Sequence, residues 1–259
     1  MDKIERANRA KKHLKWIEKT YPNYINYSVK KTKIYTNEVI GKNNDAFQKQ
    51  KKPAEIILVE NDSVSTLFDF CENDLKIAVL NFASYRNPGG GFLKGSMAQE
   101  ESLCHASSLY SCLIKFKDTF YKWNNDHLNN GLYTNRALYS PDIIFIDKQK
   151  KTIISDVITC AAPNRRYATR KRHLSEKENI VALKQRIRFI LEIAKENKVN
   201  TLILGAFGCG VFLQEGKVVA KIFIELIEND YKYCFDKIVF AIIGNNYYKF
   251  KQVLDEFID

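Results

Sequence analysis

After residue 53, short apolar runs alternate with longer stretches of helical periodicity. The apolar runs have the length and composition of buried strands and cover residues 55–59, 75–81, 143–146, 152–158, 201–204 and 237–243. Helices are predicted between them, near residues 63–72, 100–117, 178–197, 217–229 and 247–257. This alternation favours an α/β sandwich, with a parallel or mixed central sheet covered by helices on both faces.

The first 53 residues follow a different pattern. Apolar residues recur at helical spacing over residues 3–20, which predicts an amphipathic helix: Ile4, Ala7, Ala10, Leu14 and Ile17. Residues 23–53 are rich in Lys, Asn and Thr and show little periodicity, so we expect a loosely organised connection with one short strand around residues 34–36. The sequence thus divides into an N-terminal helical extension and linker, residues 1–53, and one α/β domain, residues 54–259.

The composition is that of a folded protein with an excess of positive charge. The 259 residues include only 11 Gly and 5 Pro but 16 Phe and 14 Tyr, which excludes a disordered or collagen-like chain. Lys and Arg number 41 against 30 Asp and Glu, a formal net charge of +11. An anionic partner is therefore favoured, although charge alone does not distinguish nucleic acid, a membrane surface or an acidic small molecule.

The cysteines, histidines and N-terminus indicate the compartment and exclude some kinds of site. The six cysteines are scattered without a Cys-x-x-Cys pair, and the four histidines lack the spacing of metal ligands. We expect reduced thiols, no metal ion and no cofactor. The charged N-terminus lacks the apolar core of a signal peptide, and no apolar run approaches the ~20 residues of a membrane-spanning helix. The protein is therefore predicted to be cytoplasmic, without a membrane partner.

A run of three glycines, Gly89 to Gly91, follows the strand predicted at 75–81 and precedes a Gln-Glu-Glu sequence at the start of a helix. Consecutive glycines let backbone N–H groups approach a ligand without side-chain obstruction. The adjacent carboxylates Glu100 and Glu101 suit acid–base catalysis at a glycosidic bond, provided burial or a neighbouring negative charge keeps a proton there. Two plainer interpretations stay open: the glycines form a surface turn, and the glutamates complement the helix dipole.

A second glycine-rich turn, residues 205–212, follows the strand predicted at 201–204. Its spacing matches neither the P-loop nor the dinucleotide-binding fingerprint. A strand, a glycine turn and a helix N-terminus can nevertheless hold a diphosphate through backbone N–H groups. Phe207 and Phe212 are candidates either for the core or for stacking on a ribose or base. Cys209 is expected to be a small packing residue and not a nucleophile, because no basic partner is near it in sequence.

In their order along the chain, these motifs resemble the poly(ADP-ribose) glycohydrolases, and the surrounding sequence is similar to the microbial type of that family. The resemblance covers roughly residues 55–257 and is supported by the stretches 81–86, 138–142, 161–164 and 205–212. It implies a macrodomain-like three-layer sandwich, with residues 54–259 as the catalytic domain. It also implies metal-free hydrolysis of the ribose–ribose bond of poly(ADP-ribose) by carboxylate acid–base catalysis, with ADP-ribose as the product.

The resemblance assigns roles to particular residues of this chain. Glu101 matches the catalytic acid that protonates the leaving oxygen, and Glu100 matches the neighbour that holds the ribose hydroxyls. Asp62 matches an acidic contact to adenine. The other substrate-binding residues implied are Asn81, Asn87 and Gln99, the distal-ribose turn Gly89, Gly90 and Gly91, and the diphosphate loop Gly205, Ala206, Phe207, Gly208, Cys209, Gly210, Val211 and Phe212.

Two positions depart from the family pattern. A basic residue is expected soon after the glutamate pair, where this chain has His105 and Ala106. A small residue is expected after Phe212, where it has Leu213. Both departures lie outside the glycines and the carboxylates, so they affect the expected loop geometry or polymer contacts and not the chemistry.

Two other functions are compatible with the motifs: a macrodomain that binds ADP-ribose or its polymer without cleavage, and a hydrolase that removes single ADP-ribose units from modified targets. The glutamate pair favours hydrolysis, because a pure binder does not need it. The expected partners are poly(ADP-ribose) or ADP-ribosylated macromolecules. The basic run 165–172 is interpreted as a solvated loop or as a rim that attracts the polymer's phosphates, so nucleic acid stays an alternative partner that the motifs do not favour.

Overall fold

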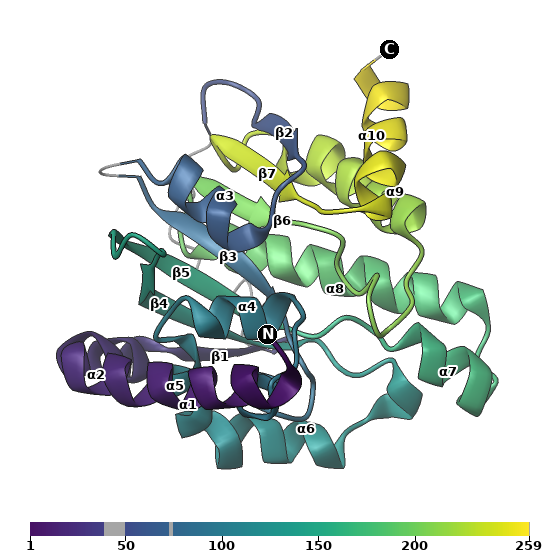
Figure 1. The fold of residues 1–259 in the computed structure, drawn as a ribbon. Helices are drawn as coiled ribbons and strands as arrows, with labels where there is room; N and C mark the ends of the chain where they lie inside the picture. Colours follow the sequence, from purple (N-terminus) through teal and green to yellow (C-terminus); the bar gives the residue numbers. More distant parts are fainter. Residues whose placement is uncertain (39–49, 73–74, 259) are drawn as a thin grey trace.

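A computed structural model describes residues 1–38, 50–72 and 75–258 (Figure 1). Within this part of the chain, seven strands form one mixed sheet in the order β1–β4–β5–β3–β6–β7–β2, with bounds β1 Lys33–Thr36, β2 Glu55–Val59, β3 Ile77–Phe82, β4 Arg136–Ile146, β5 Thr152–Cys160, β6 Thr201–Leu204 and β7 Lys237–Ala241. Neighbouring strands from β5 to β2 run parallel, and β4 is antiparallel to both of its neighbours. The predicted mixed central sheet is confirmed.

Helices cover both faces of this sheet (Figure 1). On one face lie α8 (Glu176–Glu196), α9 (Gly216–Leu226) and α10 (Asn245–Ile258), and on the other lie α1 (Lys3–Thr20), α3 (Ser63–Phe70), α4 (Gln99–His105) and α5 (Leu109–Leu113). Leu80 of β3 belongs to the hydrophobic core on the α8 face, and its neighbour Val79 belongs to the core on the α3 face. Because successive side chains of a strand point to opposite faces, this division confirms the predicted three-layer sandwich.

The helix predicted at 3–20 is confirmed as α1, and the short strand predicted around 34–36 is confirmed as β1. The loose connection predicted from residue 23 is wrong as far as residue 31, because α2 (Pro22–Lys31) occupies this segment and buries Ile25 and Ser28. The Ser28 hydroxyl donates a hydrogen bond of 2.9 Å to a backbone carbonyl of β4. Packing against the sheet thus stabilises a helix too short to be marked by its own periodicity.

The N-terminal segment also extends the sheet. β1 pairs antiparallel with β4 and forms one edge, with Lys33 opposite Tyr139 and Thr36 opposite Arg136. Residues 39–49 of the expected linker lie outside the described residues. The domain boundary placed after residue 53 stays a prediction.

Two further segments differ from the sequence prediction. The helix predicted at 100–117 is interrupted between α4 and α5, where Ser107 forms a bridge with Phe145 of β4. The basic run is the helix α7 (Arg165–Arg172), so its interpretation as a loop is wrong: Asn164 caps it, and an almost wholly polar helix shows no apolar period. The remaining short elements are η1 Phe92–Lys94, η2 Ile114–Phe116, η3 Lys117–Tyr121, α6 Lys122–Asp126, η4 Asn129–Gly131 and η5 Ile227–Tyr231.

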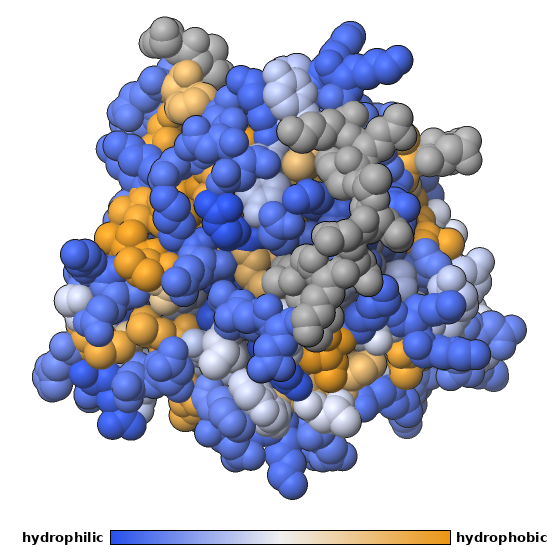
Figure 2. All heavy atoms as spheres, turned by 180° about the vertical axis from the view of Figure 1, so that it is seen from behind, coloured by the Kyte–Doolittle hydropathy of each residue, from blue (hydrophilic) through white to orange (hydrophobic). Residues whose placement is uncertain are grey.

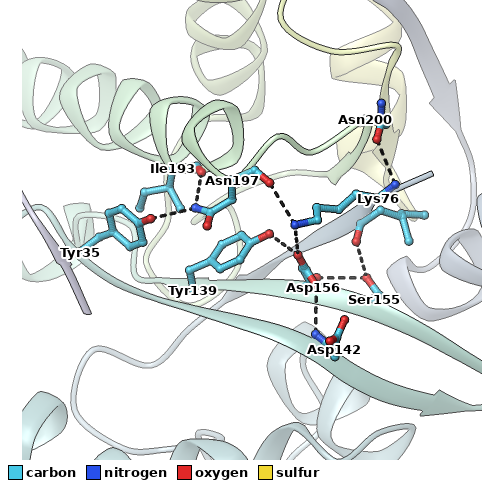
Figure 3. Close-up of polar contacts among 10 residues, drawn as sticks. Tyr35, Lys76, Tyr139, Asp142, Ser155, Asp156, Ile193, Asn197 and Asn200 are labelled. Carbon is cyan, nitrogen blue, oxygen red and sulfur yellow. Dashed lines mark hydrogen bonds and ion pairs between the residues drawn. The ribbon is translucent and has the colours of Figure 1, made fainter. Parts of the chain in front are cut away.

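A buried carboxylate connects the two longest strands at the end of the sheet where β3 begins (Figure 3). Asp156 accepts hydrogen bonds from the hydroxyl of Tyr139 and from the backbone N–H of Asp142, the latter at 3.0 Å. The Lys76 ammonium lies 3.7 Å from Asp156 Oδ2 and donates to the Asn197 carbonyl, which ties the start of β3 to the end of α8. Asp142 has a φ of +54° where the β4–β5 register shifts, so its bond to Asp156 holds a rarely populated conformation.

The surface seen from behind is mostly hydrophilic, with separate hydrophobic patches between the polar side chains (Figure 2). No helix in the described part of the chain is long and apolar enough to cross a membrane.

Replacing Tyr139 by phenylalanine removes one donor from the buried Asp156 carboxylate. We expect Tyr139→Phe to lower the free energy of unfolding by about 1–3 kcal/mol, the usual cost of an unsatisfied buried polar group. Urea denaturation measures this change, with Tyr248→Phe as the matched control because the Tyr248 side chain is exposed. Equal stability of the wild type and Tyr139→Phe would contradict the role assigned to this bond.

Candidate active site

The two glycine turns and the glutamate pair surround one cavity of about 580 Å³. The cavity lies at the carboxyl ends of β3, β6 and β7, where parallel strands place their following loops on the same edge of a sheet. Its wall consists of residues 61–64, 82–84, Gly90, 97–102, Ala162, 206–212, 241–243 and Asn246.

Glu101 is held in the cavity wall by two backbone donors. Its Oε1 accepts a hydrogen bond of 2.8 Å from the N–H of Gly91, and its Oε2 accepts one of 3.0 Å from the N–H of Ala98. Gly90 has a φ of +57°, and a Cβ at this position would lie 2.6 Å from Glu101 Oε1. The glycine turn is therefore required here because it packs directly against the carboxyl group.

Glu100 is buried beside it, with 3% of its surface exposed. Its Oε2 accepts a hydrogen bond of 2.7 Å from the N–H of Ser84, and its Oε1 accepts a weaker one of 3.4 Å from Asn81 Nδ2. Burial raises the pKa of Glu100 from 4.5 to about 8, and the neighbouring Glu101 charge adds to the rise, although the Ser84 and Asn81 donors oppose it. The folded protein thus keeps a proton on Glu100 at neutral pH.

A carboxyl group that holds its proton at neutral pH beside a second carboxyl group is the arrangement that acid–base catalysis at a glycosidic bond requires. The side-chain oxygen Oδ1 of Asn81 is buried behind Glu100 and has no hydrogen-bond partner among the described residues. Nor do the described residues contain a group of three or more His, Cys, Asp or Glu side chains that could hold a metal ion.

The second glycine turn, residues 205–212, offers backbone donors to the same cavity. Gly208 has a φ of +76°, and a Cβ there would lie 2.6 Å from the Ala162 side chain, so this turn also needs a glycine. Among the described residues, none accepts a hydrogen bond from the N–H groups of Gly208, Gly210 and Val211. The N-terminus of α9 is already capped by Glu215, whose carboxylate accepts the N–H of Val218 at 3.0 Å. Any anion held here therefore contacts the loop and not the helix end.

The side chains of this turn divide between core and cavity. Phe207 is fully buried, lines the cavity and meets the ring of Phe82 edge-on at 5.9 Å. Phe212 is partly buried and meets Tyr133 edge-on at 5.9 Å. Burial raises the pKa of the Cys209 thiol to about 12, which favours its interpretation as a packing residue and not a nucleophile.

A model of the catalytic domain of microbial-type PARG, the poly(ADP-ribose) glycohydrolases, matches residues 8–148. The chain belongs to the microbial-type PARG family. The matched segment contains the first glycine turn and the glutamate pair, so the resemblance drawn from these motifs is confirmed. It also begins inside the segment that the sequence assigned to an N-terminal extension.

Solved PARG structures agree with the whole fold. The enzyme from Thermomonospora curvata is 26% identical with a TM-score of 0.83, and the match covers 96% of this chain and 99% of that one. Its complex with the inhibitor ADP-HPD gives the same identity and TM-score over 96% and 98%. The enzyme from Deinococcus radiodurans in complex with ADP-ribose is 28% identical with a TM-score of 0.82, over 90% of this chain and 98% of that one. A comparison with curated proteins found no match.

Most of the residues that the PARG motifs single out meet at the cavity. Those that line it are Asp62, Gly90, Gln99, Glu100, Glu101, Ala206, Phe207, Gly208, Cys209, Gly210, Val211 and Phe212. Gln99 and Asp62 also form hydrogen bonds that hold neighbouring elements in place. The Gln99 side-chain amide accepts the N–H of Phe82 and donates to the Leu80 carbonyl, both at 2.8 Å, which attaches α4 to the end of β3. Asp62 caps α3 through the N–H groups of residues 64 and 65.

Five of the predicted substrate-binding residues do not line the cavity: Asn81, Asn87, Gly89, Gly91 and Gly205. Asn81, Gly91 and Gly205 contact residues that do line the cavity. Asn81 and Gly91 donate to the glutamates, and a Cβ on Gly205 would lie 2.9 Å from the Phe82 ring. Asn87 is exposed on the surface beside the glycine turn.

The sequence reasoning missed one side of the cavity. Ile242, Ile243 and Asn246 follow β7 and line the cavity, as do Met97 and Ala98 before α4. These residues belong to no recognisable motif. Their position in the sequence could have indicated a role, because residues that directly follow a parallel strand lie at the edge of the sheet where binding sites form.

The two departures from the PARG pattern have visible consequences. Leu213 has a φ of +56°, a backbone conformation that a small residue adopts with less strain. The Arg165 guanidinium donates to the Leu213 carbonyl at 2.8 Å and pairs with Glu176, so α7 secures this position. His105 lies outside the catalytic cavity, where its ring meets Phe92 at 4.7 Å.

Gly90→Ala tests the close packing of the first glycine turn. An alanine there would be strained in a left-handed conformation and would collide with both glutamates, so the free energy of unfolding should fall by about 1–3 kcal/mol. Gly210→Ala is the matched control, because a Cβ at Gly210 meets nothing within 4 Å. Thermal or urea denaturation that shows equal losses for both variants would contradict this packing.

The raised pKa of Glu100 makes stability depend on pH. The folded protein binds the Glu100 proton more tightly than the unfolded chain does. The stability that this proton contributes is therefore complete below about pH 4.5 and is lost as the pH rises to about 8. Urea denaturation across this range should therefore show wild-type stability falling relative to Glu100→Gln. Glu256→Gln, at an exposed carboxylate, should follow the wild type. A constant difference between the wild type and Glu100→Gln would overturn the assignment.

Proposed function

We propose that this chain hydrolyses the ribose–ribose bond of poly(ADP-ribose) and releases ADP-ribose in the cavity described above. The proposal rests chiefly on one observation: Glu100 and Glu101 both lie in the cavity wall, packed against a glycine turn, in a chain of the PARG family. A cavity of about 580 Å³ is in the range that encloses a ligand of nucleotide size.

The substrate would lie across the cavity between the two glycine turns. The diphosphate would accept hydrogen bonds from the unpartnered N–H groups of the 206–212 loop, which need no charged side chain to hold an anion. The adenine would lie at the end formed by Asp62 and Asn246, which places the distal ribose against Gly90 and the glutamates. In support, the related enzyme from Deinococcus radiodurans was solved in complex with ADP-ribose.

The glutamates would then supply the acid and the base. Glu100 passes the proton that the pair holds to Glu101, which delivers it to the oxygen that leaves the scissile bond, and an oxocarbenium-like ribose forms. The same residue, now a carboxylate, removes a proton from the attacking water. The orientation of Glu101 is set by the N–H groups of Gly91 and Ala98, and Glu100 beside it holds the pair's proton before the step and contacts the ribose hydroxyls. All proton transfers therefore stay within the pair, the sugar and water.

The same cavity could serve a binder or a hydrolase of single ADP-ribose units. A binder has no use for a carboxyl group that stays protonated at the reacting bond, so the burial of Glu100 favours hydrolysis. Hydrolysis of polymer and of mono-ADP-ribosylated protein use the same bond-breaking groups. The two activities are distinguished by comparing the rates of ADP-ribose release from long polymer and from a mono-modified target.

Glu101→Gln keeps the shape of the side chain and removes its acid–base function. We expect ADP-ribose release from poly(ADP-ribose) to fall by at least about 100-fold, which is the lower end of what a positioned acid or base contributes. Binding of free ADP-ribose, measured by calorimetry, should persist in this variant. Glu225→Gln, at an exposed carboxylate on α9, is the matched control and should retain wild-type turnover. Wild-type turnover in Glu101→Gln would show that another group is the acid.

A further inference from the structure

A second cavity, of about 800 Å³, adjoins the catalytic one and has no role in the reaction described above. It lies between α1, α3 and α4 and is closed on one side by the turn after β4, residues 146–150. Figure 1 shows these elements on the same side of the sheet, with α3 above α4 and α1 below it. We call this space the α1–α3 cavity.

The two cavities share a wall. Asp62, Val64, Met97 and Ser102 line both of them. Asp62 and Met97 are exposed, so the shared wall reaches the surface of the protein. A chain molecule held in the catalytic cavity can therefore continue over Met97 and Ser102, beside Glu101, into the α1–α3 cavity.

The α1–α3 cavity carries the cationic side chains that the catalytic cavity lacks. Arg6 and Arg9 of α1 line it together with Lys148 and Lys150 of the β4–β5 turn. Within the described residues, the side chains of Arg9, Lys148 and Lys150 form no ion pair and no hydrogen bond. Unpaired cations around a cavity attract phosphate groups.

Three carboxylates also line the α1–α3 cavity, and each is already engaged. Asp62 caps α3, Asp147 accepts the N–H of Lys151 at 2.8 Å, and Asp69 accepts a hydrogen bond of 3.3 Å from Asn61. These hydrogen bonds hold the carboxylates in place, whereas the side chains of Arg9, Lys148 and Lys150 are, within the described part of the chain, free to turn toward a ligand.

Aromatic side chains lie among these cations. Trp16 is 43% exposed, and the His13 ring lies 6.0 Å from its indole. The His105 ring also lines the cavity, although both of its nitrogens are buried. Burial lowers the pKa of His105 to about 4, so its ring adds no positive charge at pH 7. Cations interleaved with aromatic rings are the usual means of holding a nucleotide outside a duplex.

We propose that the α1–α3 cavity binds a second nucleotide unit of the polymer, joined to the unit in the catalytic cavity through the scissile bond beside Glu101 and reached over Met97 and Ser102 of the shared wall. Its diphosphate contacts Arg9 and the two lysines of the β4–β5 turn, and its base stacks on Trp16. This inference rests on the proposed function, because it takes the ligand of the first cavity to be one end of a repeating ADP-ribose chain. Free ADP-ribose has no second unit and does not use this cavity.

The test compares a short poly(ADP-ribose) oligomer with free ADP-ribose. Both affinities are measured in the Glu101→Gln background, which prevents cleavage, with the full chain and a labelled oligomer. The double variant Arg9→Glu with Lys148→Glu should weaken oligomer binding by about tenfold or more, which is about 1.4 kcal/mol, and leave ADP-ribose binding within about twofold. Lys177→Glu with Lys198→Glu changes the net charge equally at exposed positions elsewhere and is the matched control. Trp16→Leu, which adds no charge, should also weaken only oligomer binding.

Three results would overturn the inference: an equal loss of affinity for oligomer and monomer, an equal effect of the control variant, or oligomer binding unchanged by both Trp16→Leu and the charge reversal. Competition by single-stranded RNA as strong as that by the oligomer would instead assign the cavity to nucleic acid. Because binding is read without hydrolysis, a wild-type protein that binds the oligomer but releases no ADP-ribose would refute the proposed function and leave the second cavity standing.

Discussion

The contact between the first glycine turn and the paired carboxyl groups constrains the whole site. Gly90 leaves no space for a side chain, and Gly91 donates its N–H to Glu101. Helix α4 must then begin at a fixed distance from the end of β3, and the Gln99 amide fixes that distance by bonding to two backbone groups at the strand end. One consequence is electrostatic: with the turn closed over them, the carboxyl groups are buried deeply enough for Glu100 to keep a proton at neutral pH.

The second turn is supported from beneath by a buried cation. Arg186 is almost fully buried in α8 and donates to the Ala161 carbonyl and, at 2.8 Å, to Asn135 Oδ1. Ala162 in turn packs against Gly208, so the position of the 205–212 loop depends on a charge held by backbone and amide oxygens. Removal of such a guanidinium would leave several buried acceptors without a donor. The loop is thus held in place before a ligand arrives, which lowers the entropy lost on binding.

The sequence was informative where local patterns determine structure. Apolar residues recur at helical spacing in the helix at 3–20, and the strands around 55–59 and 201–204 are short apolar runs. The glutamate pair belongs to a recognisable motif. Helix α2 and helix α7 were missed, because one depends on packing against β4 and the other has almost no apolar face. The wall formed by Ile243 and Asn246 was missed for another reason: it arises only when β7 is placed beside β6, and pairing between distant strands leaves no local mark.

Clusters of positively charged side chains lie away from the buried carboxyl pair in this molecule. The cavity beside the glutamates is lined by glycine turns and buried carboxyl groups, whereas cations gather on α7 and around the α1–α3 cavity. This separation lets the carboxyl pair keep its proton, because a nearby guanidinium or ammonium group would favour the ionised form.

The central claim is that the buried pair holds a proton at neutral pH, and an NMR titration of glutamate carboxyl carbons tests it most directly. With the Glu100 signal assigned by its absence in Glu100→Gln, the account predicts a midpoint near pH 8 for this carboxyl group in the wild type. A midpoint close to the ordinary value of 4.5 would contradict it.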